Sequence, residues 1–326
     1  MKSKNKNYLT VIILFSISFF LILTLSSCNF SNSSNQPPNY YSGYKAVDVE
    51  LEPLVQSASR KSLLPLKITI INEGAYDASG LFFLSYPFPY LTFNKSQMSL
   101  FQDNQKGLAV YNTSTKRFGK NIDAVLKGKN MNHPFSDTKI DLIYLKPNLM
   151  MTQSEKMFTI SLDYCYNYSI FVNVPLCINP NYDLSSIESV CKVEPIYLSG
   201  GQGSIVSVDR IEPVEYLDGN NIVLILKIYL VNHGSGEITD AEITDCFSKE
   251  DSNTNLFEAK RIRLRDLKIG NHAYNELAKE YPLNEDNSFE IEVPLKNKDV
   301  GPYKTPLSFT IDYGYKDSRS VQVTVK

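Results

Sequence analysis

The cysteines are the side chains whose chemistry is easiest to assign from this sequence. Five occur, at Cys28, Cys165, Cys177, Cys191 and Cys246. The four that follow Cys28 are an even number, which is typical of disulfide bonding in an exported protein. A Cys₄ metal site is the alternative, but intervals of 11, 13 and 54 residues lack the closely spaced ligand pairs of zinc sites. We therefore expect disulfides and no metal.

Strand geometry narrows the pairings. If Cys165 lies beside a hairpin turn, Cys177 falls about 20 Å along the returning strand, at about 3.3 Å per residue. A disulfide bridges Cα atoms only up to about 7 Å apart, so this pair is disfavoured. We prefer Cys177–Cys191, which closes a short loop around Pro180, and Cys165–Cys246 is the pair that then remains. The alternation places Cys165 on the face of Asp163, away from the core, so that it reaches Cys246 only across a contact between domains.

No arrangement of residues indicates catalysis. The three histidines, His133, His233 and His272, have no Ser or Cys nearby in sequence that would form a nucleophile and base, and no HExxH pattern occurs. Neither a Walker loop nor a GxGxxG turn is present, and no carboxylate pair has the spacing of a hydrolase. We expect no enzyme activity, no cofactor and no catalytic residue, although β-sandwich enzymes can assemble sites from distant residues.

The N-terminus has the features of an export signal. Lys2, Lys4 and Lys6 precede an apolar run from Tyr8 to Leu25, and no acidic residue occurs before Asp48. The next residues, Leu25-Ser26-Ser27-Cys28, resemble the lipobox of prokaryotic lipoproteins, in which the cysteine carries the lipid and becomes the first residue of the mature chain. This resemblance implies that residues 1–27 are a signal peptide and that Cys28 is the lipidation site.

Two other interpretations stay open. The apolar run approaches the about 20 residues of a spanning helix, so it could be an uncleaved anchor, or it could be an ordinary secretion signal. All three place the later residues outside the cytoplasm, and the lipid anchor places them on the outer face of the cytoplasmic membrane. Residues 28–43 are almost all Asn, Ser, Gln, Pro and Tyr, which predicts a flexible tether.

The composition of the chain is that of a folded β-protein. Of 326 residues, 43% are apolar and 21% charged, with 21 Tyr and 17 Phe, which favours β-structure. The net charge of −2 gives no support for a nucleic-acid partner.

One strand pattern occurs twice in the sequence. Residues 64–74 alternate apolar and polar side chains and end in Asn72-Glu73-Gly74, and residues 224–234 repeat this with Asn232-His233-Gly234. A second echo aligns 158–166 with 307–315, each followed by a polar stretch and another alternating strand, which predicts a hairpin in each copy. Half-apolar sheets must bury their faces against one another.

We therefore predict an all-β protein with two tandem immunoglobulin-like β-sandwich domains. The first spans 44–178 and carries a long insertion at about 85–156, and the second spans 203–326. Residues 179–202 form a connector that the Cys177–Cys191 disulfide holds at one end. Its other end, which is Gly-rich and is followed by Gly203, is expected to be flexible. Each domain is expected to enclose its own apolar centre, with Leu66 and Ile68 buried like Leu226 and Ile228. A helix is expected only near 275–279, and a short one.

The repeated strands at 62–84 and 222–244 resemble CARDB-type domains of prokaryotic surface proteins. The Asp-Tyr-x-Tyr segments, the connector 199–203 and the segment 303–307 are similar to secreted archaeal proteins. The resemblance implies adhesive or spacer modules without catalytic residues. We expect a membrane-anchored, non-catalytic adhesive or scaffolding protein whose partners are surface proteins or glycans. The alternative is a carbohydrate-active or solute-binding lipoprotein that uses the insertion.

Two surface features have competing interpretations. Six aromatics between Phe82 and Phe93 form either core packing or an exposed platform, for which Phe88, Tyr90 and Phe93 are the candidate binding residues. The run Lys260 to Arg265 alternates with Ile262 and Leu264, which predicts a strand with a solvated positive face rather than a polyanion site.

Overall fold

The computed structural model describes residues 39–87, 90–93, 115–148, 154–179, 191–218, 221–242, 260–295 and 302–326, without the side chains of 93 and 115–124. Residues 40–326 form one compact unit, which is described below. The signal segment 1–27, Cys28 and most of the tether lie outside the described residues.

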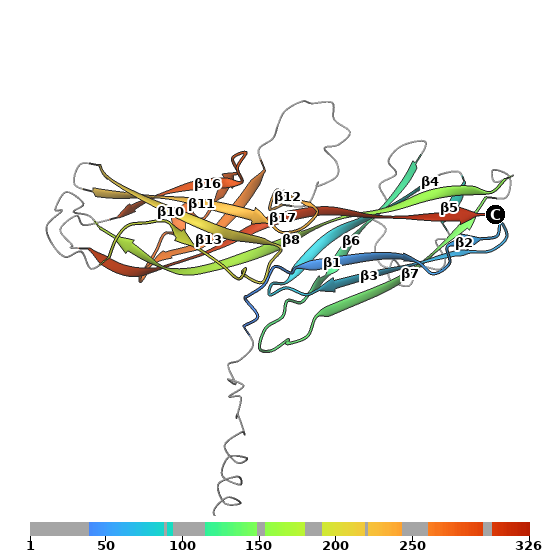
Figure 1. Ribbon diagram of the computed structural model, residues 1–326, viewed down its shortest axis with the longest axis horizontal. Helices are drawn as coiled ribbons and strands as arrows, with labels where there is room; N and C mark the ends of the chain where they lie inside the picture. Colours follow the sequence, from blue (N-terminus) through green and yellow to red (C-terminus); the bar gives the residue numbers. More distant parts are fainter. Residues whose placement is uncertain are drawn as a thin grey trace, which may run out of the picture. The chain divides into compact units, whose positions relative to one another are not determined.

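The unit is built from three sheets (Figure 1). The first has the order β1 (Val47–Pro53), β3 (Leu64–Asn72), β7 (Asp137–Pro147) and β5 (Leu91–Phe93). The second has the order β16 (Ser288–Leu295), β11 (Asn221–Asn232), β10 (Val206–Asp218) and β9 (Ile196–Tyr197).

The third, central sheet joins the other two. Its order is β14 (His272–Ala273), β13 (Arg261–Ile269), β17 (Tyr303–Val325), β8 (Lys156–Ile178), β4 (Ala78–Pro87) and β6 (Thr115–Leu126). Three short strands complete it, of which β12 (Glu237–Thr239) and β2 (Ser57–Ala58) pair with β17, and β15 (Glu280–Pro282) pairs with β13. A single 3₁₀ turn, η3 (Asn275–Leu277), is found among the described residues, where a short helix was expected.

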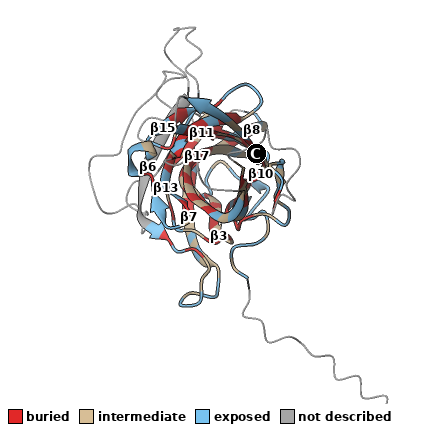
Figure 2. Ribbon diagram, turned by 90° about the vertical axis from the view of Figure 1, so that its left-hand side faces the viewer, coloured by how far each residue is buried: buried red, intermediate tan, exposed pale blue. Residues whose placement is uncertain are grey.

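Each four-stranded sheet packs against one half of the central sheet, and this makes two β-sandwiches (Figures 1 and 2). Sandwich 1 contains β1, β3, β5 and β7 opposite β4 and β6, and sandwich 2 contains β9, β10, β11 and β16 opposite β13. The buried residues lie on the inward faces of the strands in the end-on view of Figure 2. The all-β sandwich class is therefore confirmed, whereas its immunoglobulin-like type stays a prediction.

The two sandwiches share their two longest strands. β8 and β17 are antiparallel and pair residue by residue from Lys156↔Val325 to Ile178↔Tyr303, over 23 residues each. At about 3.3 Å per residue this ribbon is about 75 Å long. The predicted hairpins are wrong: the polar stretches read as turns, around Asn167 and Lys316, lie in mid-strand. We call the place where β8 and β17 pass from one sandwich to the other the waist, around Asn167 and Gly314, which pair with each other.

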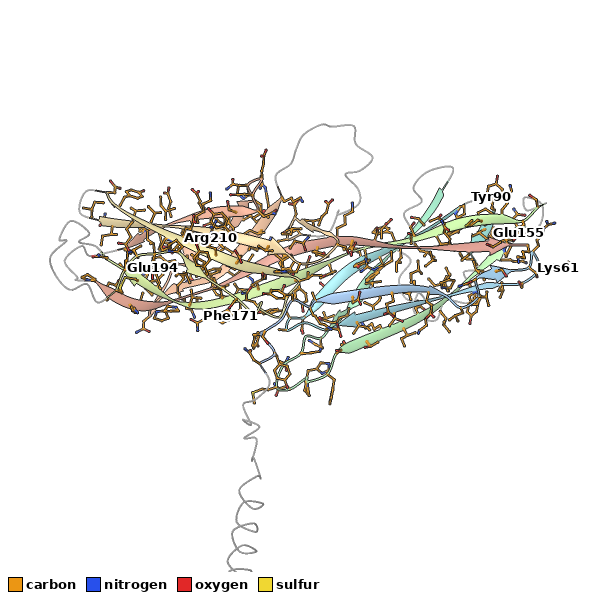
Figure 3. The ribbon with its side chains drawn as sticks, in the orientation of Figure 1. Lys61, Tyr90, Glu155, Phe171, Glu194 and Arg210 are labelled. Atoms are coloured by element: carbon orange, nitrogen blue, oxygen red, sulfur yellow. A yellow bond between two sulfur atoms is a disulfide. The ribbon has the colours of Figure 1, made fainter. Side chains whose placement is uncertain are left out.

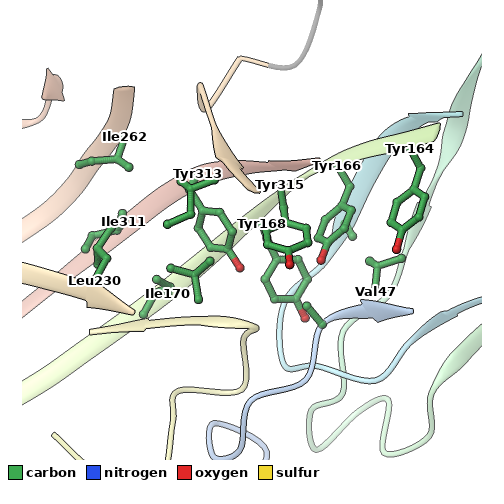
Figure 4. Packing of buried hydrophobic residues seen from close by; sticks show 14 of the residues in the cluster. Val47, Tyr164, Tyr166, Tyr168, Ile170, Leu230, Ile262, Ile311, Tyr313 and Tyr315 are labelled. Atoms are coloured by element: carbon green, nitrogen blue, oxygen red, sulfur yellow. The ribbon is translucent and has the colours of Figure 1, made fainter. Parts of the chain in front are cut away.

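Buried tyrosines fill the waist (Figure 4). Five tyrosines point to the same side of the ribbon and are at most 2% exposed: Tyr164, Tyr166, Tyr168, Tyr313 and Tyr315. Their rings pack against one another across the ribbon, with centroids 5.5 Å apart for Tyr166 and Tyr315 and 6.3 Å apart for Tyr168 and Tyr313. Buried side chains of both sandwiches form one continuous cluster through them. This differs from the expectation of two separate apolar centres.

The core residues named from the repeat are nevertheless correct. Leu66, Leu226 and Ile228 are 0% exposed and Ile68 is 4% exposed. The boundaries 44–178 and 203–326 stay a prediction, and the segment 85–156 supplies β5, β6 and β7 to sandwich 1.

Each Asn-x-Gly turn is held by a tyrosine of the ribbon. Asn72 Nδ2 donates to the Tyr76 carbonyl at 2.8 Å, and the Tyr76 amide donates to Tyr168 Oη at 3.2 Å. In the second copy Asn232 Nδ2 donates to the Gly236 carbonyl at 2.7 Å, and the Gly236 amide donates to Tyr315 Oη at 2.8 Å. Tyr168 is therefore the counterpart of Tyr315, whereas the sequence alignment had matched Tyr166 to it.

The Gly-rich connector is docked at the waist, which corrects the expectation of a flexible end. The Gly43 amide donates to the Gly200 carbonyl at 2.6 Å, and the Gly203 amide donates to the Gly43 carbonyl at 3.0 Å. Gln202 is 7% exposed, and its Oε1 accepts from the Val208 amide at 2.9 Å. The last tether residue is therefore bound to the connector.

Gly201 and Gly200 provide a matched test of this docking. Both have positive φ, +70° and +85°, but a Cβ on Gly201 would lie 2.2 Å from the Gly43 carbonyl oxygen, whereas none lies within 4 Å at Gly200. We expect Gly200→Ala to cost about 1–2 kcal/mol for the left-handed backbone, and Gly201→Ala clearly more because backbone must move. Chemical denaturation of the two variants measures this, and equal losses would show that the docking is loose.

Candidate functional site

The waist carries a cavity of about 350 Å³, which we call the waist pocket. Its lining comes from six segments distant in sequence: 44–48, the two Asn-x-Gly turns, β8, β17 and Ile205 just before β10. The residues are Tyr44, Lys45, Ala46, Val47, Asp48, Glu73, Tyr164, Ile205, Gly234, Ser235, Tyr315, Asp317 and Arg319. Both sandwiches therefore contribute to it.

Asp317 is the most connected polar group in the pocket. Its side chain is 11% exposed, and its Oδ2 accepts from Arg319 Nη1 at 2.8 Å, Ser235 Oγ at 2.9 Å and Tyr164 Oη at 3.1 Å. The Ser318 amide donates to Oδ1 at 2.8 Å. These donors compensate the burial of the carboxylate.

Arg319 connects this carboxylate to sandwich 1. Its Nε donates to the Val49 carbonyl on β1 at 3.1 Å, and its Nη2 lies 3.6 Å from Asp48 Oδ1. The guanidinium also lies 5.8 Å from the centre of the Tyr164 ring. Asp317 and Arg319 thus form an ion pair on the inward face of β17, between apolar residues such as Tyr315 and Val321.

The charges of the pocket do not balance. Lys45 Nζ binds Glu73 Oε2 at 2.7 Å, and Arg319 binds Asp317 at 2.8 Å and approaches Asp48 to 3.6 Å. Asp48 is the third acid, which leaves a formal net charge of −1 among the lining residues.

Two tyrosines of the pocket, Tyr164 and Tyr315, are held in their neutral form. Burial raises the pKa of Tyr164, and the nearby charge of Asp317 raises it further. Burial also raises the pKa of Tyr315. Both phenols therefore keep their protons at neutral pH.

The nearest approach to a catalytic pair is Ser207 with His233. Ser207 Oγ lies 2.8 Å from His233 Nε2, which is within the range of a nucleophile and its base. Ser207 is only 3% exposed, however, whereas His233 and Tyr44, whose tilted rings have centroids 3.9 Å apart, are exposed. The buried hydroxyl is shielded from a substrate, so the geometry favours a structural hydrogen bond.

The cysteines agree in part with the predictions. Cys177–Cys191 is formed, with Cα atoms 5.8 Å apart. Cys165 is also disulfide-bonded; it alternates with the inward Tyr164 and Tyr166 and so lies on the face of Asp163 as predicted, but it is 0% exposed there. Cys165 and Cys177 lie on the same strand β8, so the exclusion of that pair was right although the hairpin behind it was wrong. Cys246, like Cys28, lies outside the described residues.

The aromatic segment divides between core and rim. Phe82 and Tyr86 are buried at 8% and 2% exposure. Tyr90 is half-buried at the far end of sandwich 1, near Glu155 in Figure 3, with its ring 5.5 Å from that of Phe158 and Lys156 Nζ 4.5 Å from its centre. Phe88 and the side chain of Phe93 lie outside the described residues, so a binding platform stays a prediction.

The basic strand is confirmed as one with a solvated face. Ile262 and Leu264 are 0% exposed, and Arg263 pairs with Glu280 at 3.0 Å while Arg265 pairs with Asp312. The paired arginines leave little free positive charge on this part of the surface.

No group of three His, Cys, Asp or Glu side chains in the described parts of the chain is placed to hold a metal ion. No helix within the described ranges has the length and hydropathy to cross a membrane.

The waist pocket was missed from sequence, although a signal for it exists. Tyr313, Tyr315, Val321 and Val323 share one face of β17, and Asp317 and Arg319 interrupt that apolar series at inward positions. The polar stretch was instead interpreted as a turn. Two polar residues at core positions of a continuous strand indicate a buried ion pair.

Comparison with known proteins adds no assignment. No protein-family model matches the chain, and no curated protein sequence matches it. Similar solved structures include the partial N-terminal region of an enterococcal surface protein, at 12% identity and a TM-score of 0.24 over 86% of each chain. They also include red sea bream transglutaminase, at 9% identity and TM-score 0.20 over 86% of this chain and 31% of that one.

A third is Spo0M, a sporulation control protein from Bacillus subtilis, at 10% identity and TM-score 0.15 over 56% of this chain and 79% of that one. TM-scores this far below 0.5 do not establish a shared fold or function, so the function must be inferred from the unit itself.

Proposed function

We propose that this chain is a membrane-anchored extracytoplasmic protein whose unit 40–326 serves as a non-catalytic adhesive or scaffolding module. The observation that carries the proposal is the shared β8–β17 ribbon, which joins two sandwiches into one unit about 75 Å long. A continuous antiparallel ribbon resists bending at the waist better than a linker would, which suits a module that must hold a fixed form under load.

The point of attachment refines the proposal. Gly43, the last residue of the tether, is bonded to the connector at the waist and not at either end of the ribbon. A spacer gains most reach when the chain enters at one end. Entry at the waist instead favours a scaffold that presents both ends, so the adhesive or scaffolding role is preferred to a spacer role.

Two observations support export. Cys177 and Cys191 are bonded, and Cys165 is disulfide-bonded as well. Structural disulfides persist in oxidising compartments outside the cytoplasm. The lipid on Cys28 is proposed from the Leu25-Ser26-Ser27-Cys28 boundary.

Intact-mass measurement of the membrane-extracted protein tests the anchor. We expect a chain that begins at lipidated Cys28, and we expect Cys28→Ser to remain uncleaved because the peptidase substrate is lost. A wild-type species that retains Met1 to Ser27, or an unmodified Cys28, would contradict the anchor.

The adhesive role needs a separate measurement. Beads coated with the full chain should bind isolated cell envelopes saturably and should release no soluble product from them. Absence of binding would contradict adhesion, and release of sugar fragments would favour the carbohydrate-active alternative. The solute-binding alternative has its own support in the waist pocket, which lies outside the 85–156 segment for which it was predicted.

A further inference from the structure

The waist pocket has the size and chemistry of a site for a small ligand. Its volume of about 350 Å³ is at the lower end of the range for ligand sites, roughly 300–1,000 Å³. It combines a few convergent polar groups with the ring of Tyr44, which is 42% exposed, while Tyr164 and Tyr315 behind it are each 1% exposed.

The cations of the pocket are already used. Lys45 Nζ binds Glu73, and Arg319 binds Asp317 through Nη1 and the Val49 carbonyl through Nε. An anionic ligand would have to displace one of these bonded carboxylates, so the pocket is not arranged to receive an anion.

Acceptor capacity remains, by contrast. The Asp48 side chain is 53% exposed, and within the described part of the chain its ion pair is the 3.6 Å approach of Arg319. Glu73 accepts from Lys45 through Oε2, which leaves Oε1 for another donor. With three acids and two cations in the lining and the exposed ring of Tyr44 beside them, the pocket favours a positive charge, because ring faces and carboxylates both attract cations.

We propose that the waist pocket binds a small primary ammonium group attached to a short hydrocarbon chain. The ammonium donates to Asp48 and Glu73 at the rim, and the hydrocarbon lies against the exposed ring of Tyr44. Asp317 and Arg319 hold the two sandwiches in register around the ligand and are positioning residues. The inference goes beyond the adhesive function and does not depend on the lipid anchor.

Isothermal titration of the full chain with n-butylammonium tests the proposal, with butanol and butyrate as probes of matched length. We expect saturable binding of the ammonium, weaker binding of butanol and none of butyrate. Asp48→Asn should weaken ammonium binding by about fivefold or more, which corresponds to about 1 kcal/mol.

Glu50→Gln is the matched control, since Glu50 is exposed two residues further along β1 and does not line the pocket. It should change the affinity less than about twofold, because screened surface charges contribute little. Absence of saturable ammonium binding, equal binding of butyrate, or equal effects of the two substitutions would overturn the proposal. Thermal unfolding of each variant verifies that the unit is folded.

Discussion

Replacing Ile228 by Ala will destabilise residues 40–326 as a whole and not sandwich 2 alone. Ile228 is 0% exposed on β11, paired with Ile211 on one side and Phe289 on the other. Loss of such a buried side chain costs about 2–5 kcal/mol, from lost transfer free energy and the cavity left behind. β8 and β17 belong to both sandwiches. Unfolding of sandwich 2 therefore breaks the pairing of β8 with β17 over half of their length and exposes the tyrosines of the waist.

Native-state hydrogen exchange in increasing denaturant measures this effect. We expect the amides of β3 in sandwich 1 and β11 in sandwich 2 to lose the same free energy of opening. Val231→Ala is the control on the same strand, since Val231 is 36% exposed and its truncation should cost little. If β3 keeps its full protection while β11 exchanges, the sandwiches unfold separately and the independent-domain expectation is right.

Removing the disulfide of Cys165 will cost more stability than removing Cys177–Cys191. The described residues show that Cys165 is bonded but not to which cysteine. We predict Cys246 as its partner, because Cys177 and Cys191 bond each other and Cys28 is the proposed lipidation site. On the chain-entropy model, the resulting loop of 82 residues contributes about 4.5 kcal/mol, against about 3 kcal/mol for the 15-residue loop.

Chemical denaturation of the two double Cys→Ala variants compares these losses. The small loop closes at the end of β8, so its loss should leave the waist intact. Peptide mapping under non-reducing conditions identifies the partner directly. A peptide that links Cys165 to Cys28, or a larger loss for the small loop, would contradict the prediction.

The sequence by itself determined the parts of this protein that depend on local patterns. Alternation over 64–74 and 224–234 was sufficient to identify β3, β11 and their buried faces, because side chains of a strand alternate between two faces. Turn chemistry identified the Asn-x-Gly ends, and loop length with cysteine count identified Cys177–Cys191. The alternating arginines of β13 were interpreted correctly for the same reason.

Only the tertiary structure decided whether a polar stretch is a turn or a strand. Around Asn167, and again between Lys316 and Ser320, the residues have the composition of a hairpin turn, yet both stretches are extended because each pairs with the other strand of the ribbon. The inward charge of Asp317 is tolerated there because Arg319, Tyr164 and Ser235 bind it.

The same long-range pairing explains the other differences. The connector looked flexible because glycine has few restraints of its own, but Gly43 and Ala75 approach it so closely that only glycine fits at 201 and 203. The waist pocket draws on residues from 44 to 319, and their meeting depends on the register of β8 against β17. Such a register is set by burial of the tyrosines at the waist and by pairing between residues about 150 positions apart, which no local pattern specifies.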